Sequence, residues 1–276
     1  MDFDYYLVNA IRGRLMDAES LLLFDGLLSG SPRDYGSSVA EYFKKASEQI
    51  RMDSPELFSA MEKAPSSKES QGFYSGLGRR PEPFTDIWRC YFDSGIVKLS
   101  QEEFFVDCGA EELFSSYRFA KLTHGKYRGI LALEPAPDNF EKCRMNAELF
   151  DVRLELRRLA VGGGSGKRRF SACGAGSRFD QNGELDVETA SLDELLSGKR
   201  PSFIKLHLEG AELEAVEGAE STIRRCGPRL AICLHRFEDA ASIPARLLKY
   251  RPDYRLWLRH YSTGPEETVL YADTQV

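Results

Sequence analysis

The chain has 276 residues, of which 42% are hydrophobic and 29% are charged. These values are typical of globular proteins and exclude the disordered and fibrous classes, and the length allows one large domain or a medium domain with an appendage. The formal net charge of -6 argues against general nucleic-acid binding, because phosphate recognition needs a dominant basic surface.

The six cysteines are scattered along the chain, with no Cys-x-x-Cys pair and no zinc-like Cys/His spacing. The spacing therefore predicts no metal site, and we interpret most of the thiols as small buried groups in a reducing compartment. The N-terminal stretch MDFDYYLVNAIRGRL has two early acidic residues and no long apolar core. Since no run approaches the roughly 18 apolar residues of a membrane span, we expect a cytoplasmic protein without membrane attachment.

The first 63 residues or so have helical periodicity, with broad apolar faces in two segments, 17–30 and 37–52. The residues that follow, 63–84, are dense in Ser, Gly, Pro and charged residues, which marks a loop or a boundary. We predict a helical N-terminal appendage with its linker over 1–100 and a second domain over 101–276. The role of the appendage is open between a dimer interface and a lid.

From about residue 101, short apolar runs alternate with helical patterns, which is typical of βαβ units around a mostly parallel sheet. Strands are predicted at 103–109, 129–135, 152–161, 202–210 and 228–236. Helices are expected at about 111–122, 136–149, 211–225 and 239–249.

The last part of the chain breaks this alternation. The runs 254–261 and 267–273 flank the turn-forming STGPE and predict an antiparallel hairpin at one edge of the sheet. The glycine-rich segment 162–190 predicts a loop or irregular hairpin over the sheet. After it, the sequence SLDE predicts a helix that begins at Ser191 with a capping box.

Polar residues close most of the parallel strands, at the edge where ligands of open α/β sheets bind. Gly109 allows a tight turn and close approach of a ligand, and Asp107 can accept hydrogen bonds from loop amides or an ammonium group. Glu134 stands where a mononucleotide-binding half needs a carboxylate for the ribose hydroxyls. Two such acids on successive strands favour a nucleoside-type ligand over two turn caps.

Four segments resemble the FkbM-type, S-adenosylmethionine-dependent methyltransferases, which have a Rossmann-like seven-stranded class I fold. They are FVDCGA, LEPAPDNFEKCRMNAEL, VETASLDELL and FIKLHLEGAELEAVEGA, and they span about residues 101–240. The resemblance implies S-adenosylmethionine as the cofactor. It also implies where the parts of the cofactor lie: the methionine part at Asp107 and Gly109, the ribose at Glu134, and the adenine near Leu159, Ala160 and Val161. The neighbouring residues Cys108, Ala110 and Pro135 are further candidates for cofactor binding.

Two positions depart from the family pattern. The first turn continues with Glu111 and Glu112 in place of Asn and a second glycine, which alters how the loop meets the charged amino-acid part of the cofactor. His207 stands where the family signature has Asp; it can act as a general base for a hydroxyl, or it can simply pack at a strand end. The candidate catalytic residues are His207, Glu209 and His235.

These features favour a methyltransferase that acts on an oxygen nucleophile. The resemblance suggests a hydroxyl of a sugar or related metabolite as the small-molecule or glycan acceptor. A degenerate member that serves as a binding module is the alternative, and a nicotinamide dehydrogenase is third, because no Gly-x-Gly-x-x-Gly follows the first strand. A second copy of the chain, docked through the N-terminal helices, is a possible partner; nucleic acid and membrane are not.

Overall fold

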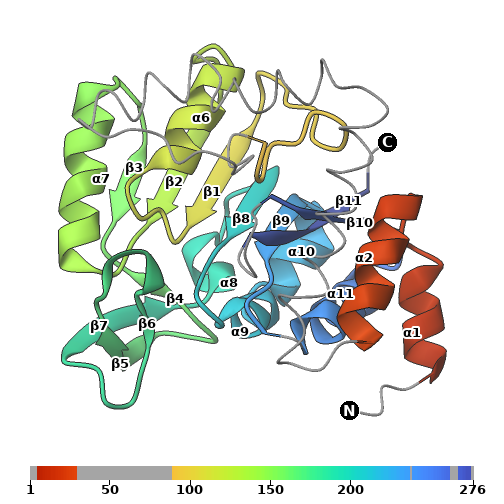
Figure 1. The fold of residues 1–276 in the computed structure, drawn as a ribbon. Helices are drawn as coiled ribbons and strands as arrows, with labels where there is room; N and C mark the ends of the chain where they lie inside the picture. Colours follow the sequence, from red (N-terminus) through yellow and green to blue (C-terminus); the bar gives the residue numbers. More distant parts are fainter. Residues whose placement is uncertain (1–4, 30–88, 237, 262–266, 275–276) are drawn as a thin grey trace, which may run out of the picture.

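The computed structural model describes residues 5–29, 89–236, 238–261 and 267–274. Its centre is a seven-stranded sheet in the order β10-β11-β9-β8-β1-β2-β3 (Figure 1). The strands are β1 (Phe104–Cys108), β2 (Gly129–Leu133), β3 (Glu155–Arg157), β8 (Phe203–Leu206), β9 (Arg229–Cys233), β10 (Arg255–His260) and β11 (Thr268–Asp273).

The pairing within this sheet confirms the predicted fold class. The five strands β9, β8, β1, β2 and β3 follow one another in the sheet and are all parallel, whereas β11 runs antiparallel to both β9 and β10. The sheet is therefore a mostly parallel, Rossmann-like sheet that ends in an antiparallel hairpin at one edge. The turn of that hairpin lies outside the described residues.

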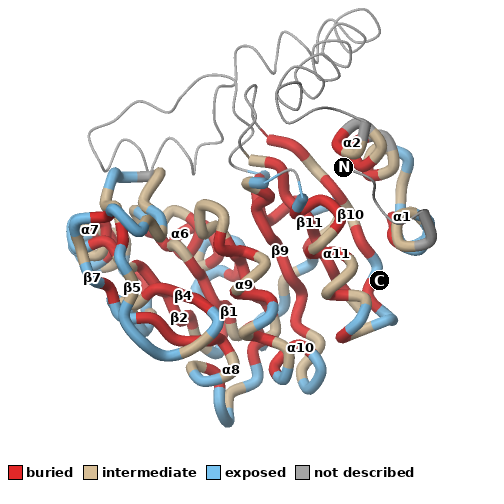
Figure 2. The backbone as a smooth tube through the Cα atoms, turned by 90° about the horizontal axis from the view of Figure 1, so that it is seen from below, coloured by how far each residue is buried: buried red, intermediate tan, exposed pale blue. Residues whose placement is uncertain are grey.

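Helices cover both faces of the sheet, and the central strands are buried along their length (Figure 2). The helices are α1 (Tyr5–Arg12), α2 (Ala18–Ser29), α6 (Phe114–Leu122), α7 (Pro137–Leu149), α8 (Leu192–Leu195), α9 (Glu212–Glu217), α10 (Glu220–Cys226) and α11 (Asp239–Tyr250). One apolar cluster packs the helices α1, α2, α8, α9, α10 and α11 against one face of the sheet. A second packs α6 and α7 against the other face. None of the helices in the described ranges has both the length and the apolar character that crossing a membrane requires.

Strand β1 is where the direction of chain progression reverses. From β1 the chain moves to β2 and β3 on one side, and it later returns to β8 and β9 on the other. Ligands of open α/β sheets bind at such a reversal, beyond the carboxyl ends of the strands. The carboxyl ends of β1 and β8 are therefore the expected place for a site.

The prediction for residues 152–190 needs correction. The run predicted as one strand, 152–161, divides between β3 in the main sheet and β4 (Ala160–Val161) in a second sheet. Of the two alternatives predicted for the glycine-rich segment, the loop is wrong, whereas the hairpin agrees with the antiparallel pairing of β5 (Gly166–Ser171) with β6 (Arg178–Phe179) and β7 (Leu185–Ala190). These strands supply the rest of the four-stranded sheet, at the lower left of Figure 1. A small apolar cluster around Phe170 and Val187 holds it together.

Two helices also differ from their predicted bounds. The helix expected from residue 111 begins at Phe114, because Glu111 and Leu113 have positive φ angles of 50° and 75° that no α-helix accepts. The helix expected over 211–225 is two helices, α9 and α10. The break falls at Gly218, where a Cβ atom would lie 2.6 Å from the carbonyl oxygen of Gly162. The helix at Ser191 has both hydrogen bonds of the predicted capping box.

The two described N-terminal helices pack against the sheet domain. Ile11 and Phe24 are fully buried in the same apolar cluster as β10 and α11, and Leu15 forms an isolated bridge with Leu256 of β10. The second predicted helical segment, 37–52, and the linker lie outside the described residues. Helices α1 and α2 thus complete the core of the domain that follows them.

This packing predicts the effect of removing a side chain from α2. Phe24→Ala would leave a cavity in the shared cluster and is expected to lower the free energy of unfolding by about 3–5 kcal/mol. Met16→Ala is the matched control, because Met16 is 42% exposed and its loss should change stability by no more than about 0.5 kcal/mol. Urea unfolding followed by circular dichroism measures both. Equal, small effects would show that α2 is not part of the cooperative core.

Candidate active site

A cavity lies beyond the carboxyl ends of β1, β2 and β8, and we call it the strand-end cavity. Ten of the residues singled out in the sequence line it: Gly109, Ala110, Glu111, Glu134, Pro135, Leu159, Ala160, Val161, His207 and Glu209. Asp107, Cys108 and His235 are not among the residues that line it. The fold thus brings the expected cofactor-binding residues together with two of the three candidate catalytic residues.

The turn after β1 depends on Gly109. Its φ angle is 78°, and a Cβ atom at this position would lie 2.0 Å from the carbonyl oxygen of His207. The amide groups of Gly109 and Ala110 both donate to the carbonyl oxygen of Leu133, at 3.0 and 3.1 Å. The backbone of Gly109 and Ala110 is therefore held between the end of β2 and the end of β8, where it forms part of the cavity wall.

Behind this turn lies a buried ion pair between Asp107 and Lys205. The Lys205 Nζ atom is 3.1 Å from Asp107 Oδ1 and donates to the carbonyl oxygen of Gly109 at 2.6 Å. Burial disfavours the ammonium form of Lys205, but the charge of Asp107 outweighs it and raises the pKa of the lysine. Asp107 also accepts from Ser116 at 2.7 Å. Asp107 therefore acts on the cavity through Lys205, which lines it.

Glu134 holds the backbone of two loops from the end of β2. Its carboxylate accepts from the amides of Glu111 and Ala136, both at 2.9 Å. Burial raises its pKa to about 7, although these two hydrogen bonds favour the ionised form. A carboxylate has about four lone-pair positions, so each oxygen keeps one with which to accept from a ligand.

The candidate catalytic residues form a continuous hydrogen-bonded chain. Tyr91 contacts His207 through its hydroxyl and the Nδ1 atom. His207 Nε2 lies 3.0 Å from Glu209 Oε1, which in turn lies 3.3 Å from His235 Nε2. His235 Nδ1 lies 2.8 Å from Glu212 Oε1. His235 thus stands behind Glu209 and reaches the cavity only through it.

Electrostatics assign different tasks to the members of this chain. Burial alone would raise the pKa of Glu209, but hydrogen bonds from His207 and His235 hold it well below its usual range. Burial disfavours the charged form of His235, yet its hydrogen bonds to Cys233, Glu209 and Glu212 raise its pKa. A protonated His235 between two carboxylates cannot accept another proton. Of the two histidines, His207 is therefore the one suited to act as a base.

Several lining residues had no signal in the sequence. Tyr91 comes from the stretch before the sheet, Glu267 from the position just before β11, and Phe170 and Phe179 from the small sheet. Tyr91 and Glu267, like Glu111 and Glu209, have positive φ angles. Such backbone conformations are costly for residues other than glycine and concentrate at functional sites, but they depend on tertiary packing that motif spacing does not report.

The close approach at Gly109 gives a sharp prediction. Gly109→Ala would suffer both the positive φ and the clash with the His207 carbonyl oxygen, whereas Gly125→Ala has a similar φ of 71° with no atom within 4 Å of the new Cβ. The second variant should cost about 1 kcal/mol of stability and the first about 1–3 kcal/mol more. Urea unfolding of the two variants measures the difference. Equal losses would contradict the contact between the turn and β8.

The chain is similar in sequence and in fold to known methyltransferases. Hexuronic acid methyltransferase AglP of Haloferax volcanii is 25% identical over 149 residues, which are 50% of this chain and 62% of AglP. The crystal structure of Methyltransferase FkbM from Methylobacillus flagellatus superposes with a TM-score of 0.65 at 22% identity, over 97% of this chain and 58% of that one. The chain covers less than two thirds of the length of either protein.

The family assignment rests on the sequence itself. Residues 107–261 match the Methyltransferase FkbM domain. This match begins at the end of β1 and ends after β10, so it includes the carboxyl ends of β1, β2 and β8, beyond which the cavity lies. The fold of the crystal structure from Methylobacillus flagellatus agrees with it. The chain therefore belongs to the FkbM methyltransferase domain family.

Proposed function

We propose that this protein is an S-adenosylmethionine-dependent methyltransferase that methylates a hydroxyl group of a sugar or related metabolite. The observation that carries the proposal is the strand-end cavity, in which a glycine turn, a buried carboxylate and a histidine base candidate face one another. Family membership supports methyl transfer. The hexuronic acid substrate named for the relative AglP supports a sugar acceptor.

The chemistry of the cavity fits the nucleoside part of this cofactor. Glu134 would accept hydrogen bonds from both ribose hydroxyls with its remaining lone pairs. The walls around it are apolar and aromatic, as an adenine ring requires; they include Ala160, Val161, Phe170 and Phe179. A Cβ at Gly109 would collide with the His207 carbonyl oxygen, so glycine is required for the turn to lie against the end of β8, and Gly109 itself lines the cavity.

The charged end of the cofactor would meet the residues that depart from the family pattern. Glu111 lines the cavity, and burial raises the pKa of its carboxyl group. A cofactor ammonium would compensate that burial by pairing with the carboxylate. Lys205 lines the same region and suits a carboxylate. We therefore assign Glu111, rather than Asp107, to the ammonium group.

The protein's catalytic task is alignment and removal of one proton. When bound, S-adenosylmethionine supplies an electrophilic methyl group on a sulfonium. Glu209 accepts the Nε2–H of His207, so that Nδ1 accepts from the Tyr91 hydroxyl, which lines the cavity. Tyr91 would pass its proton to Nδ1 and take the proton of the acceptor hydroxyl as the acceptor oxygen attacks the methyl group. His235 and Glu212 fix the position of Glu209. His207 is thus the base, Glu209 orients it, and His235 is a positioning residue.

The acceptor would occupy a second hollow, the charged cleft, which shares Phe179, Glu209 and Ala211 with the strand-end cavity. Arginine and glutamate side chains dominate its wall; they include Arg168, Arg169, Arg236, Glu214 and Glu217. Polar walls of this kind suit the many hydroxyls of a sugar. Arg236, beside Gly210 at the end of β8, is placed to pair with a carboxylate on such an acceptor.

Cofactor binding tests the first half of this proposal. Calorimetric titration with S-adenosylhomocysteine should show micromolar binding by the wild type, and Glu134→Gln should weaken it at least about tenfold, since it loses a charged hydrogen-bond acceptor. Because the pKa of Glu134 is about 7 and ribose hydroxyls favour the ionised acceptor, wild-type affinity should fall several-fold from pH 8 to pH 6. The variant should lack most of this fall.

The control for this titration is Glu141→Gln on α7, where Glu141 pairs with Arg144 in an exposed contact. It should bind as the wild type does. A folded wild type that binds no S-adenosylhomocysteine would overturn the assignment and leave the reading of a degenerate binding module.

The acceptor is tested by product formation. The protein should release S-adenosylhomocysteine when mixed with S-adenosylmethionine and a hexuronic acid glycoside. Arg236→Gln should raise the KM for that acceptor about tenfold or more with little change in kcat, and it should not affect a neutral hexose glycoside. Chromatography of the products measures both. An equal effect on the two acceptors would contradict a carboxylate contact at Arg236.

A further inference from the structure

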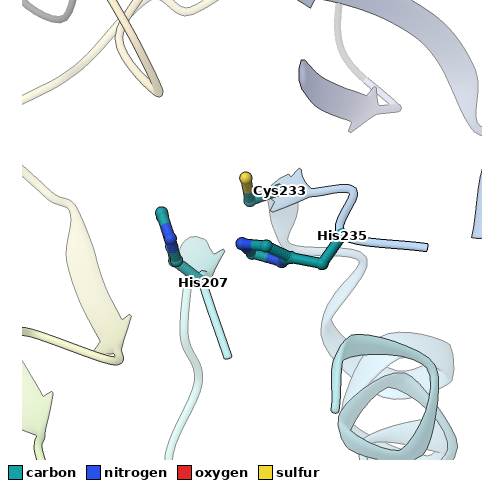
Figure 3. A group of neighbouring side chains, drawn as sticks. All are labelled: His207, Cys233 and His235. Carbon is teal, nitrogen blue, oxygen red and sulfur yellow. The ribbon is translucent and has the colours of Figure 1, made fainter. Parts of the chain in front are cut away.

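We propose that His207, Cys233, His235 and Glu209 form a binding site for Zn²⁺ or a similar borderline-soft divalent metal at the carboxyl ends of β8 and β9. One ligand atom from each of the first three residues lies within 4.8 Å of the others. Figure 3 shows the two imidazoles and the sulfur gathered around one point between the strand ends. A nitrogen, sulfur and carboxylate donor set of this kind suits zinc.

The backbone places these donors on one side of the sheet. In β8 and β9, Lys205 pairs in register with Ala231; two residues further along each strand stand His207 and Cys233. Side chains two apart on a strand share a face, so the sulfur and the His207 imidazole leave the sheet in the same direction. His235, two residues beyond Cys233, follows on that side, and the positive φ of Glu209 returns its carboxylate toward the two rings.

The outer partners of both histidines match those of metal-bound histidines. His235 Nδ1 is held by the buried carboxylate of Glu212 and His207 Nδ1 by the Tyr91 hydroxyl. In each case Nε2 is left to face Glu209 Oε1, at 3.0 Å from His207 and 3.3 Å from His235. Metal ligands of this type have their second ring nitrogen fixed by such a partner, which sets the tautomer and the ring orientation.

Charge and distance also agree with a cation here. The carboxylates of Glu209 and Glu212 lie beside the rings, and Glu267 lies 3.3 Å from the Tyr91 hydroxyl, while the ammonium group of Lys205 is paired with Asp107. Metal–ligand bonds of roughly 2.0–2.3 Å bring the donor atoms of a tetrahedral site to about 3.5 Å from one another, so about 1 Å of side-chain movement closes the site. Binding replaces the protons on Nε2 and on the thiol.

The proposal of this site does not depend on the proposed methyl transfer, because metal binding can be measured without any cofactor or acceptor. It borders the strand-end cavity through His207 and Glu209. A zinc ion there would lower the pKa of a hydroxyl that it contacts, and would thus take over the proton removal that His207 performs without it. Motif spacing gave no sign of the site, since its donors come from two strands.

The test uses the full chain, stripped with a chelator and then titrated with Zn²⁺ or Co²⁺ alone. We expect one metal ion per chain by elemental analysis, and with Co²⁺ a thiolate-to-cobalt absorption band in the near ultraviolet. Cys233→Ser should abolish this band, and His207→Ala should weaken Co²⁺ binding at least about tenfold. Cys173→Ser is the control for stray thiol binding, because Cys173 is an exposed free cysteine, and it should retain the band.

Two results would overturn the proposal: binding of less than about half an ion per chain by the folded wild type, or Co²⁺ affinity that His207→Ala leaves unchanged. Cys233 is fully buried, so its variant is first checked for cooperative unfolding. If that variant does not fold, the wild-type spectrum and the His207→Ala titration decide, because the His207 side chain is 24% exposed and its removal leaves the core intact.

Discussion

The buried ion pair between Asp107 and Lys205 is the interaction on which the rest of the site depends. It joins β1 to β8 at the point where the strand order reverses, and the lysine also holds the carbonyl oxygen of Gly109. Removing one partner of such a pair leaves a buried charge and costs about 3–5 kcal/mol. The pair therefore fixes the turn at Gly109 and, through that turn, the wall of the strand-end cavity. Neither the Asp107 carboxylate nor the Lys205 ammonium would be stable in this buried position without the other charge.

The cavity itself is built at a cost in backbone conformation. Tyr91, Glu111, Glu209 and Glu267 line it with positive φ angles, and each such residue costs about 1–2 kcal/mol. Packing of the sheet and its two apolar clusters supplies the stability that holds them in place. The result is a group of three carboxylates and a phenol aimed into one space, which local sequence preference would not favour.

The sequence predicted those features that depend on local pattern. The strands β1, β2, β8, β9, β10 and β11, the capping box at Ser191 and the carboxylate at the end of β2 follow from periodicity and spacing, and the structure has all of them. The predicted strand 152–161 is the exception, because it is divided between two sheets. Features made by distant segments could not be predicted. Tyr91 reaches His207 from outside the motif-bearing region, and β4 and β6, with two residues each, are too short to show a period. The placement of His235 behind Glu209 depends on the register of β8 and β9, which no motif reports.

The most direct test of the central claim is a crystal structure of the protein grown with S-adenosylhomocysteine. We predict that the ligand lies in the strand-end cavity, with its ribose hydroxyls bonded to Glu134, its amino-acid end against the turn at Gly109, and its sulfur directed toward His207. A ligand bound elsewhere, or an empty cavity in crystals grown at a saturating concentration of the ligand, would contradict the claim that the strand ends form the cofactor site.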